Sequence, residues 1–398
     1  MHAVVAFGMA VLASLGPGPF TKGTHPGIGS SGPRDYYVYQ PSVRTTTGPQ
    51  PLVVFLHGCT QTAKDAAIGT RWTELAEKRD FIAVFPEQSV AANGTQCWNW
   101  FLPDHQKRGV GEPGIIAEIT RSVIASTGAD PSRVYVMGIS AGADMAMIMG
   151  ATYPDLFAAT SGFAGCAYAT CADVTGTLAK AAMGPYVRVL PALLFQGTAD
   201  VLNDFALGET MARQWVGTDG LSQVPSSVEH VGLDATFLAG LGTTADTCVR
   251  NRQFPCASGV RGNKPYPYSI EHHADAVGCA IVDFWILHGL GHDYPGGDPA
   301  GTFTDPAGPD VTTAAYDWFL RHRLGRPCGG VAAASAGSVE PAPANPPPSA
   351  GTPSPAATLP HTGATPGVDV ALLVALTALS RRRVGRRRRR RRGAATAS

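Results

Sequence analysis

The most constraining feature of this sequence is the segment Arg133–Ala146, which reads as a buried strand, a tight turn and a helix. The turn is Gly-Ile-Ser-Ala-Gly, and it carries Ser140 between two glycines at positions 138 and 142. Side chains at those two positions would collide with neighbouring backbone, which explains the glycines. The turn lifts the serine hydroxyl above the sheet at a helix N-terminus, where free N–H groups favour negative charge. The segment therefore predicts a nucleophilic serine.

Strands alternate with helices on both sides of this turn, which predicts an α/β fold with a largely parallel sheet. The apolar run Pro51–Gly58 is typical of a central parallel strand. Residues 219–275 are harder to assign and are expected to hold loops over the site. Length and element order fit an α/β-hydrolase with a mainly parallel central sheet flanked by helices. The other predicted elements are an edge strand at Asp35–Pro41, strands at Phe81–Pro86, Leu193–Gly197 and Val282–Leu287, and helices at Thr70–Arg79 and Glu112–Thr127.

Charge divides the chain into an acidic body and a basic end. The formal net charge is +1, but residues 363–398 carry ten arginines against one aspartate. This end therefore has a charge of +9, which leaves −8 on the rest of the chain. An acidic body argues against nucleic-acid binding by the folded part. The hydrophobic content of 44% is sufficient for a substantial core.

The N-terminus and the cysteines both indicate an oxidising compartment. Residues Ala3–Leu15 are apolar and uncharged, like the central part of a secretory leader, and we assign residues 1–24 to a signal peptide. The eight cysteines are scattered and form no pair of C-x-x-C motifs, so we expect disulfides rather than a zinc site. Cys166 and Cys171 could close a small loop, whereas the other pairings stay open.

The composition changes after Cys328. Residues 329–358 are rich in Ala, Pro, Ser and Gly and predict a disordered linker, which leaves residues 25–328 as the catalytic domain. Residues 359–398 contain Leu-Pro-His-Thr-Gly, a short apolar stretch and the arginines. This order resembles the cell-wall sorting signal of Gram-positive bacteria. The resemblance implies that a sortase cleaves between Thr362 and Gly363 and joins the threonine to peptidoglycan.

A serine hydroxyl needs a base and an acid, which an α/β-hydrolase supplies later in the chain. Asp200 follows a predicted strand end by three residues and is the favoured acid, with Asp204 as the alternative. His292 lies in a glycine-rich loop after the last strand and is the favoured base, with His288 as the alternative. The neighbouring residues His272 and His273 lack spaced partners for a metal site.

A tetrahedral intermediate needs preplaced N–H donors, which we assign to the backbone of Ala141 and Cys59. His57, beside this loop, is expected to be structural. Trp98 and Trp100, followed by Phe101, could form an apolar platform for a polyester chain or an aromatic acyl group. The alternative for these aromatic residues is core packing.

Five motifs of the sequence are informative together: Leu56–Gln61, Phe85–Gln88, Cys97–Phe101, Val134–Gly142 and Gly291-His292. They resemble the poly(3-hydroxybutyrate) depolymerase family of esterases, which is similar to the feruloyl and acetylxylan esterases of carbohydrate esterase family one. The resemblance covers residues 34–324 and implies a secreted serine esterase without metal or organic cofactor. It also implies that Ser140, Asp200 and His292 form a triad and that Cys59 and Cys97 are bridged.

The sequence departs from this family at Gln196, where a histidine usually precedes Gly-Thr-Ala-Asp. We expect this departure to bear on substrate specificity rather than on reaction type.

The predicted function is a secreted, wall-anchored serine esterase that forms an acyl-enzyme and most resembles a polyester depolymerase. A feruloyl or acetylxylan esterase acting on acylated polysaccharide is the alternative. A non-catalytic surface protein that binds through a hydrolase fold is a third possibility. The complete set of Ser140, Asp200 and His292 favours an enzyme.

Overall fold

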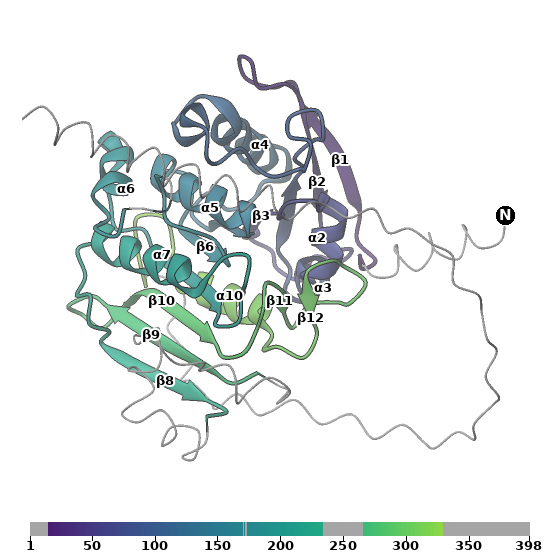
Figure 1. The fold of residues 1–398 in the computed structure, drawn as a ribbon. Coiled ribbons are helices and arrows are strands. Elements are labelled where there is room, and N and C mark those ends of the chain that lie inside the picture. Colours follow the sequence, from purple (N-terminus) through teal and green to yellow (C-terminus); the bar gives the residue numbers. More distant parts are fainter. Residues whose placement is uncertain (1–14, 170, 172, 234–265, 329–398) are drawn as a thin grey trace, which may run out of the picture. The chain divides into compact units, whose positions relative to one another are not determined.

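A ten-stranded sheet organises the part of the chain that the computed structural model describes, residues 15–169, 171, 173–233 and 266–328 (Figure 1). All of these residues lie in the first of two units, which ends at residue 337. The strand order is β1-β2-β4-β3-β5-β6-β7-β10-β9-β8. The strands are β1 (Phe20–His25), β2 (Arg34–Tyr39), β3 (Leu52–Leu56), β4 (Ile82–Pro86), β5 (Val134–Ile139), β6 (Ala159–Phe163), β7 (Ala192–Gly197), β8 (Ser227–Val231), β9 (Tyr268–Ala274) and β10 (Ala280–Leu287).

The six central strands, from β4 to β10 in the spatial order, are mutually parallel, and two antiparallel strands flank them on each side. Strands β3 to β7 are buried along their whole length. The continuous apolar sequences of β3 and β4 follow from this burial, because helices cover both faces of a parallel sheet. The structure therefore confirms the predicted fold class.

Helices cover both faces of the sheet (Figure 1). One core cluster joins the sheet to α4 (Gly111–Thr127), α5 (Ala141–Thr152) and α7 (Phe205–Thr218). The opposite cluster joins it to α2 (Ala63–Gly69), α3 (Trp72–Arg79) and α10 (Val311–Phe319). The described residues also form α6 (Thr177–Ala182), two short 3₁₀ turns at Pro103–Gln106 and Gly184–Tyr186, and a two-stranded ribbon of β11 (Tyr294–Pro295) and β12 (Thr304–Asp305).

The start of the domain bears on two predictions. The leader that we assigned to residues 1–24 stays a prediction, but its end overlaps β1, which begins at Phe20 and pairs with all of β2. The Phe20 ring stacks on Tyr37 with centroids 5.1 Å apart. The folded part therefore begins before residue 25. Because β1 pairs with it, β2 is an inner strand rather than the predicted edge.

Three disulfides link described residues: Cys59–Cys97, Cys166–Cys171 and Cys279–Cys328. The small loop and the bridge between the two family motifs are thus confirmed. Cys248, Cys256, the linker at 329–358 and the sorting signal at 359–398 lie outside the described residues. Among the helices that the structure describes, none has the length and apolar character needed to span a membrane.

Candidate active site

Ser140 lies at the junction of β5 and α5, in a backbone conformation that L-residues rarely adopt. Its φ is 55° and its ψ is −126°. The Ser140 N–H donates to the carbonyl of Phe163 at 2.9 Å, which ties the turn to the neighbouring strand. A Cβ at Gly138 would lie 2.2 Å from the Gly142 carbonyl oxygen, and one at Gly142 would lie 2.0 Å from that of Leu56. The turn can therefore form only with glycine at both positions.

The strands β5, β7 and β10 end at one edge of the sheet, and each is followed by a candidate site residue. Register aligns Ile139 with Phe163, Phe163 with Phe195, and Phe195 with Trp285. Parallel strands in this register place the segments after Ile139, Gly197 and Leu287 beyond the same carboxyl edge. This is the edge at which open α/β sheets bind ligands.

Asp200 and His292 meet at this edge. The Nδ1 atom of His292 lies 2.7 Å from Asp200 Oδ2, and the two side chains are 10% and 0% exposed. The N–H groups of Leu202 and Asn203 both donate to Asp200 Oδ1 at 2.9 Å. The amide of Gln196 also donates to Oδ2, at 3.3 Å. Asp200 is thus held in one orientation. Because it pairs with Nδ1 of His292, the other ring nitrogen, Nε2, is not used in this contact.

Backbone contacts between the loops after β7 and β10 bring this pair together. The Ala199 N–H donates to the carbonyl of Leu290 at 3.0 Å, and the Gly289 N–H donates to Thr198 Oγ1 at 2.9 Å. A Cβ at Gly197 would lie only 2.4 Å from the Leu290 carbonyl oxygen. The absence of a side chain at Gly197 therefore allows the acid loop and the histidine loop to pack directly.

The segments that carry the two proposed oxyanion donors lie next to the serine: Ala141 follows it in the chain, and Cys59 follows Gly58 in the loop after β3. A Cβ at Gly58 would be 3.4 Å from the Ser140 Cβ, so the loop after β3 lies beside the elbow. No recorded hydrogen bond of the described residues uses the N–H of Cys59 or Ala141. The neighbouring N–H groups are fixed: that of Gly58 donates to Gln61 Oε1 at 2.8 Å, and that of Thr60 to the Thr95 carbonyl at 2.7 Å.

His57 has the structural role that we expected. Its side chain is fully buried, and the Gln88 N–H donates to its Nε2 at 2.9 Å. The ring proton is therefore on Nδ1, which donates to the Gly58 carbonyl at 2.7 Å. Burial lowers the pKa of His57 to about 4, so the ring stays neutral and keeps this tautomer at physiological pH.

The sequence did not reveal the role of Glu112, a fully buried carboxylate that supports the same loop. It accepts from Asn99 N and Asn99 Nδ2, both at 2.7 Å, from Gln88 Nε2 at 2.5 Å and from Arg34 Nη2 at 3.0 Å. Several donors compensate for the burial of one charge, and they hold Gln88 and Asn99 on either side of Cys97. In the sequence, Glu112 looks like any acidic residue near the start of a helix. Its partners lie in other segments of the chain, so no local pattern could have identified its role.

The rejected alternatives have structural roles. Asp204 is the N-cap of α7 and accepts from the Ala206 N–H at 2.8 Å. His288 is buried, and its Nε2 lies 2.9 Å from Ser269 Oγ. Burial lowers the pKa of His288 to about 4. His272 pairs with Asp283 at 2.8 Å, and this hydrogen bond raises the pKa of His272.

The tryptophan prediction needs a correction. Trp98 is fully buried in the core, and its indole N–H donates to the His57 carbonyl at 3.1 Å. A substrate cannot reach it, so its role is packing. Trp100 is partly buried against the same core and contacts the exposed ring of Phe101, with centroids 5.7 Å apart. Trp100 therefore remains available at the surface.

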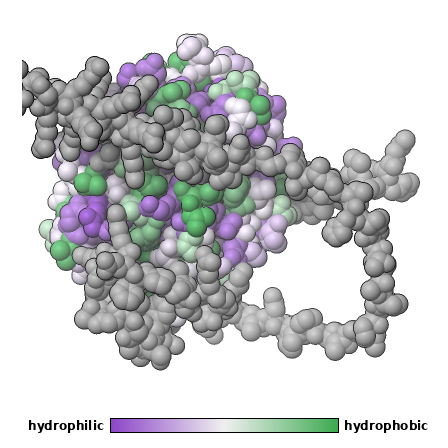
Figure 2. Space-filling view, in the orientation of Figure 1, coloured by the Kyte–Doolittle hydropathy of each residue, from purple (hydrophilic) through white to green (hydrophobic). Residues whose placement is uncertain are grey.

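Exposed apolar residues surround the acid and the base instead. Val201 and Leu202, directly after Asp200, are 84% and 49% exposed. The exposed ring of Phe303 lies edge-on to His292, with centroids 6.2 Å apart. The face shown in Figure 2 carries both hydrophobic and hydrophilic residues. The sequence indicated none of these three residues, because loop residues show no periodic pattern.

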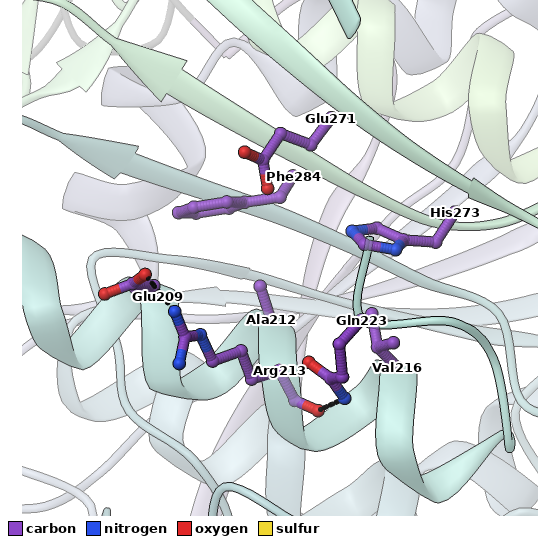
Figure 3. A pocket seen from close by; sticks show the side chains of 8 residues that line it. All are labelled: Glu209, Ala212, Arg213, Val216, Gln223, Glu271, His273 and Phe284. Atoms are coloured by element: carbon purple, nitrogen blue, oxygen red, sulfur yellow. Dashed lines mark hydrogen bonds and ion pairs between the residues drawn. The ribbon is translucent and has the colours of Figure 1, made fainter. Parts of the chain in front are cut away.

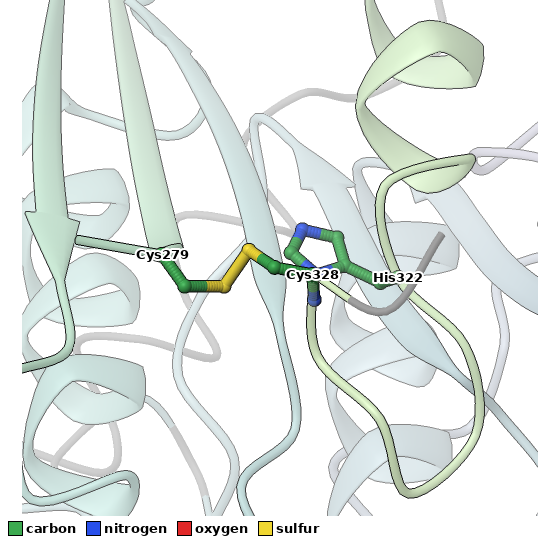
Figure 4. Close-up of side chains that lie close together, drawn as sticks. All are labelled: Cys279, His322 and Cys328. Atoms are coloured by element: carbon green, nitrogen blue, oxygen red, sulfur yellow. A yellow bond between two sulfur atoms is a disulfide. The ribbon is translucent and has the colours of Figure 1, made fainter. Parts of the chain in front are cut away.

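Two further clusters lie apart from this site. A pocket between α7 and the strands β9 and β10 is lined by none of the proposed site residues (Figure 3). Cys279, His322 and Cys328 have their donor atoms within 4.8 Å of one another, an arrangement that could suggest a metal site. The two sulfur atoms are bonded to each other, however, so they are not available as thiolate ligands (Figure 4).

The profile of the family described as "Esterase PHB depolymerase" matches residues 35–241, which contain Ser140, Asp200 and the oxyanion loop. The chain belongs to this family. Its relatives include poly(3-hydroxyalkanoate) depolymerase C of Paucimonas lemoignei, with 33% identity over 266 residues, 67% of this chain and 59% of that protein. Probable acetylxylan esterase A of Aspergillus fumigatus is 37% identical over 153 residues, 37% of this chain and 40% of that protein.

This member of the esterase PHB depolymerase family therefore spans less than two thirds of the length of these two relatives. Among solved structures, it is similar to an acetyl xylan esterase from Aspergillus awamori. The TM-score is 0.54 and the identity 21%, over 76% of this chain and 99% of that chain. At this identity the likeness shows the α/β-hydrolase fold alone.

Proposed function

We propose that this protein is a serine esterase with Ser140 as nucleophile, His292 as general base and Asp200 as the acid that orients the base. The observation that carries the proposal is the 2.7 Å contact between His292 Nδ1 and Asp200 Oδ2, at the sheet edge that also holds the strained Ser140 turn. Membership of an esterase family supports the same reaction type.

The reaction follows from these positions. His292 takes the proton of the Ser140 hydroxyl as Oγ attacks the ester carbonyl, and Asp200 stabilises the imidazolium that forms. The Cys59 and Ala141 N–H groups donate to the developing oxyanion. The imidazolium then protonates the leaving alcohol, and an acyl-enzyme remains on Ser140. Water, activated by His292, attacks this acyl-enzyme and releases the acid.

The decisive assay is hydrolysis of p-nitrophenyl butyrate by the wild type and by Ser140→Ala. We expect a fall in kcat by a factor of about 10⁶, the scale found when a triad serine is removed. Ser126→Ala, on α4, is the matched control and keeps full activity. An inactive wild type, or an equally active Ser140→Ala, would instead support a non-catalytic binding protein.

For the substrate, we propose an apolar polyester of hydroxyalkanoic acids. The exposed side chains of Val201, Leu202 and Phe303 beside the catalytic pair support this choice, because they offer apolar surface to the chain. The depolymerase of Paucimonas lemoignei is named for such a substrate. The test compares hydroxybutyrate oligomers with acetylated and feruloylated xylan. Release of acid from xylan alone would establish the polysaccharide esterase alternative.

For localisation, we propose secretion and covalent attachment to the cell wall through the pentapeptide at residues 359–363. Its order with the following apolar and basic segments supports the proposal. Thr362→Ala should release the protein into the medium, whereas Thr365→Ala, outside the pentapeptide, should leave it attached. A wall-linked Thr362→Ala protein would refute sortase attachment.

A further inference from the structure

Gln196, the residue at which the sequence departs from the family pattern, faces the catalytic acid from inside the protein. It is the second-last residue of β7, and its side chain is fully buried. Its Nε2 lies 2.9 Å from the Asn203 carbonyl oxygen and 3.3 Å from Asp200 Oδ2. A third contact, also at 3.3 Å, is to the Gly197 carbonyl. Because Gln196 is buried, it can affect substrate choice only through the residues that it contacts.

The amide joins the two ends of the acid loop. Asp200 Oδ2 receives both the Gln196 amide and His292 Nδ1, while Oδ1 receives the N–H groups of Leu202 and Asn203. Because Gln196 also donates to the Asn203 carbonyl, one side chain fixes the carboxylate and the turn that follows it. Loss of the amide would free Asp200 Oδ2 to rotate away from His292.

The surroundings of Gln196 fit this side chain closely. A Cβ at Gly208 on α7 would lie 2.6 Å from the Cβ and Cγ of Gln196 and 2.8 Å from its Oε1. Only glycine at position 208 therefore leaves room. In the described residues, Gln196 Oε1 has no hydrogen-bond donor. Burying an unpaired oxygen destabilises the folded state. Any stabilising contribution of the Gln196 side chain amide therefore comes from the hydrogen bonds that its N–H groups donate.

We propose that Gln196 is a positioning residue that holds Asp200 Oδ2 towards His292 with a donor that cannot ionise. The inference rests on the proposed esterase function, since it assigns a role to Gln196 within that triad. Asp200 is the titratable side chain that Gln196 contacts in the described part of the chain, and His292 is its next neighbour. An amide does not titrate in this pH range, so it donates to Asp200 at every pH. It therefore does not compete with His292 for the proton taken from Ser140.

The first test is Gln196→Met, which keeps the length of the side chain and removes the donor. With p-nitrophenyl butyrate we expect kcat to fall about tenfold, which corresponds to one net hydrogen bond, and KM to change less than twofold. A loss confined to KM, or no loss in a folded variant, would overturn the proposal.

The second test is Gln196→Glu, read as the ratio of its kcat/KM to that of the wild type from pH 5 to pH 9. Burial beside Asp200 raises the pKa of a carboxyl at this position, so at low pH the protonated group still donates to Oδ2. As the pH rises, the group ionises, loses its donor and repels Asp200. The ratio should therefore fall at least tenfold across this range, whereas a merely structural residue would give a flat ratio.

Gln214 on α7 provides a matched control. It is equally buried, and its Nε2 lies 3.4 Å from Asp173 Oδ2, away from the triad. Gln214→Glu thus creates a comparable buried acid pair and should give a flat ratio. A flat ratio for Gln196→Glu, or the same slope for both variants, would refute the positioning role. An inactive wild type would instead refute the proposed function itself.

Discussion

The disulfide Cys59–Cys97 allows the stability of the domain to be separated from the geometry of the oxyanion loop. The bridge closes a loop with a sequence separation of 38 residues. By chain entropy, a cross-link of this span stabilises the folded state by about 4 kcal/mol. We therefore expect the double variant Cys59→Ala/Cys97→Ala to lose about that amount in urea unfolding.

The same variant should lose much less kcat than the removal of an oxyanion donor would cause. The oxyanion donor at Cys59 is its backbone N–H, and the N–H groups on both sides of it are held independently. Gly58 N–H donates to Gln61 Oε1, and Thr60 N–H donates to the Thr95 carbonyl. Removing an oxyanion donor costs about 10²- to 10³-fold in kcat. Because those two hydrogen bonds remain, we expect a loss of less than about tenfold.

Gln61→Met is the matched comparison, because it removes the acceptor of Gly58 N–H and the 2.9 Å hydrogen bond from Gln61 Nε2 to the Thr302 carbonyl while the disulfide remains. We expect the opposite result: a stability loss of about 1–3 kcal/mol and a kcat loss greater than that of the double variant. Rates are measured at a temperature at which circular dichroism shows both variants folded. A 100-fold loss in the double variant, or an unchanged kcat in Gln61→Met, would refute the reasoning.

Three further predictions concern the triad and the helix of the elbow. Asp200→Asn should lower kcat by about 10⁴ without unfolding the protein, because the amide favours the wrong tautomer of His292; a kcat within tenfold of wild type would contradict this role. Gly142→Ala should lower the free energy of unfolding by about 3 kcal/mol or more, since its Cβ would meet the Leu56 carbonyl oxygen at 2.0 Å; thermal melting checks this. Burial raises the pKa of Asp144 to about 8, so its charge opposes folding as the pH rises from about 4 to 8; over this range urea unfolding should show Asp144→Asn gaining stability relative to wild type, and a constant difference would refute the shift.

The sequence could predict the central strands and the elbow because their causes are local. Strand β5 is buried on both faces, so all of its residues must be apolar or small, and such a run is visible without knowing its neighbours. The glycines at 138 and 142 are required by backbone atoms within the turn and the adjacent strand. The glycine signal is strong because a side chain added at either position would collide with backbone atoms, which cannot move aside as a side chain can.

Strand β1 could not be predicted in the same way. Its sequence, Phe-Thr-Lys-Gly-Thr-His, buries no residue completely and has no clear alternation. Its stability comes from pairing with β2 and from the stacking of Phe20 on Tyr37, which are contacts between segments. The missed strand explains why the wrong strand was taken as the edge and why the assigned leader overlaps β1.

In the candidate site too, the sequence identifies single residues but does not show which of them are in contact. Strand ends and turn composition identified Ser140, Asp200 and His292, but the sequence could not show that Asp200 and His292 meet, because 92 residues separate them. Trp98 and Trp100 belong to one motif, and only the packing reveals that Trp98 is inside and Trp100 near the surface.

Gln196 illustrates how burial changes the meaning of a sequence difference. From the sequence alone, a replacement next to a catalytic loop reads as a change in what the enzyme binds. In the sheet, successive side chains of β7 are all buried, so Gln196 cannot face the substrate and can act only through what it contacts. Those contacts are the acid and the end of its loop. The departure at this position therefore concerns how Asp200 is held, and differences in substrate choice should be sought among the exposed residues around His292.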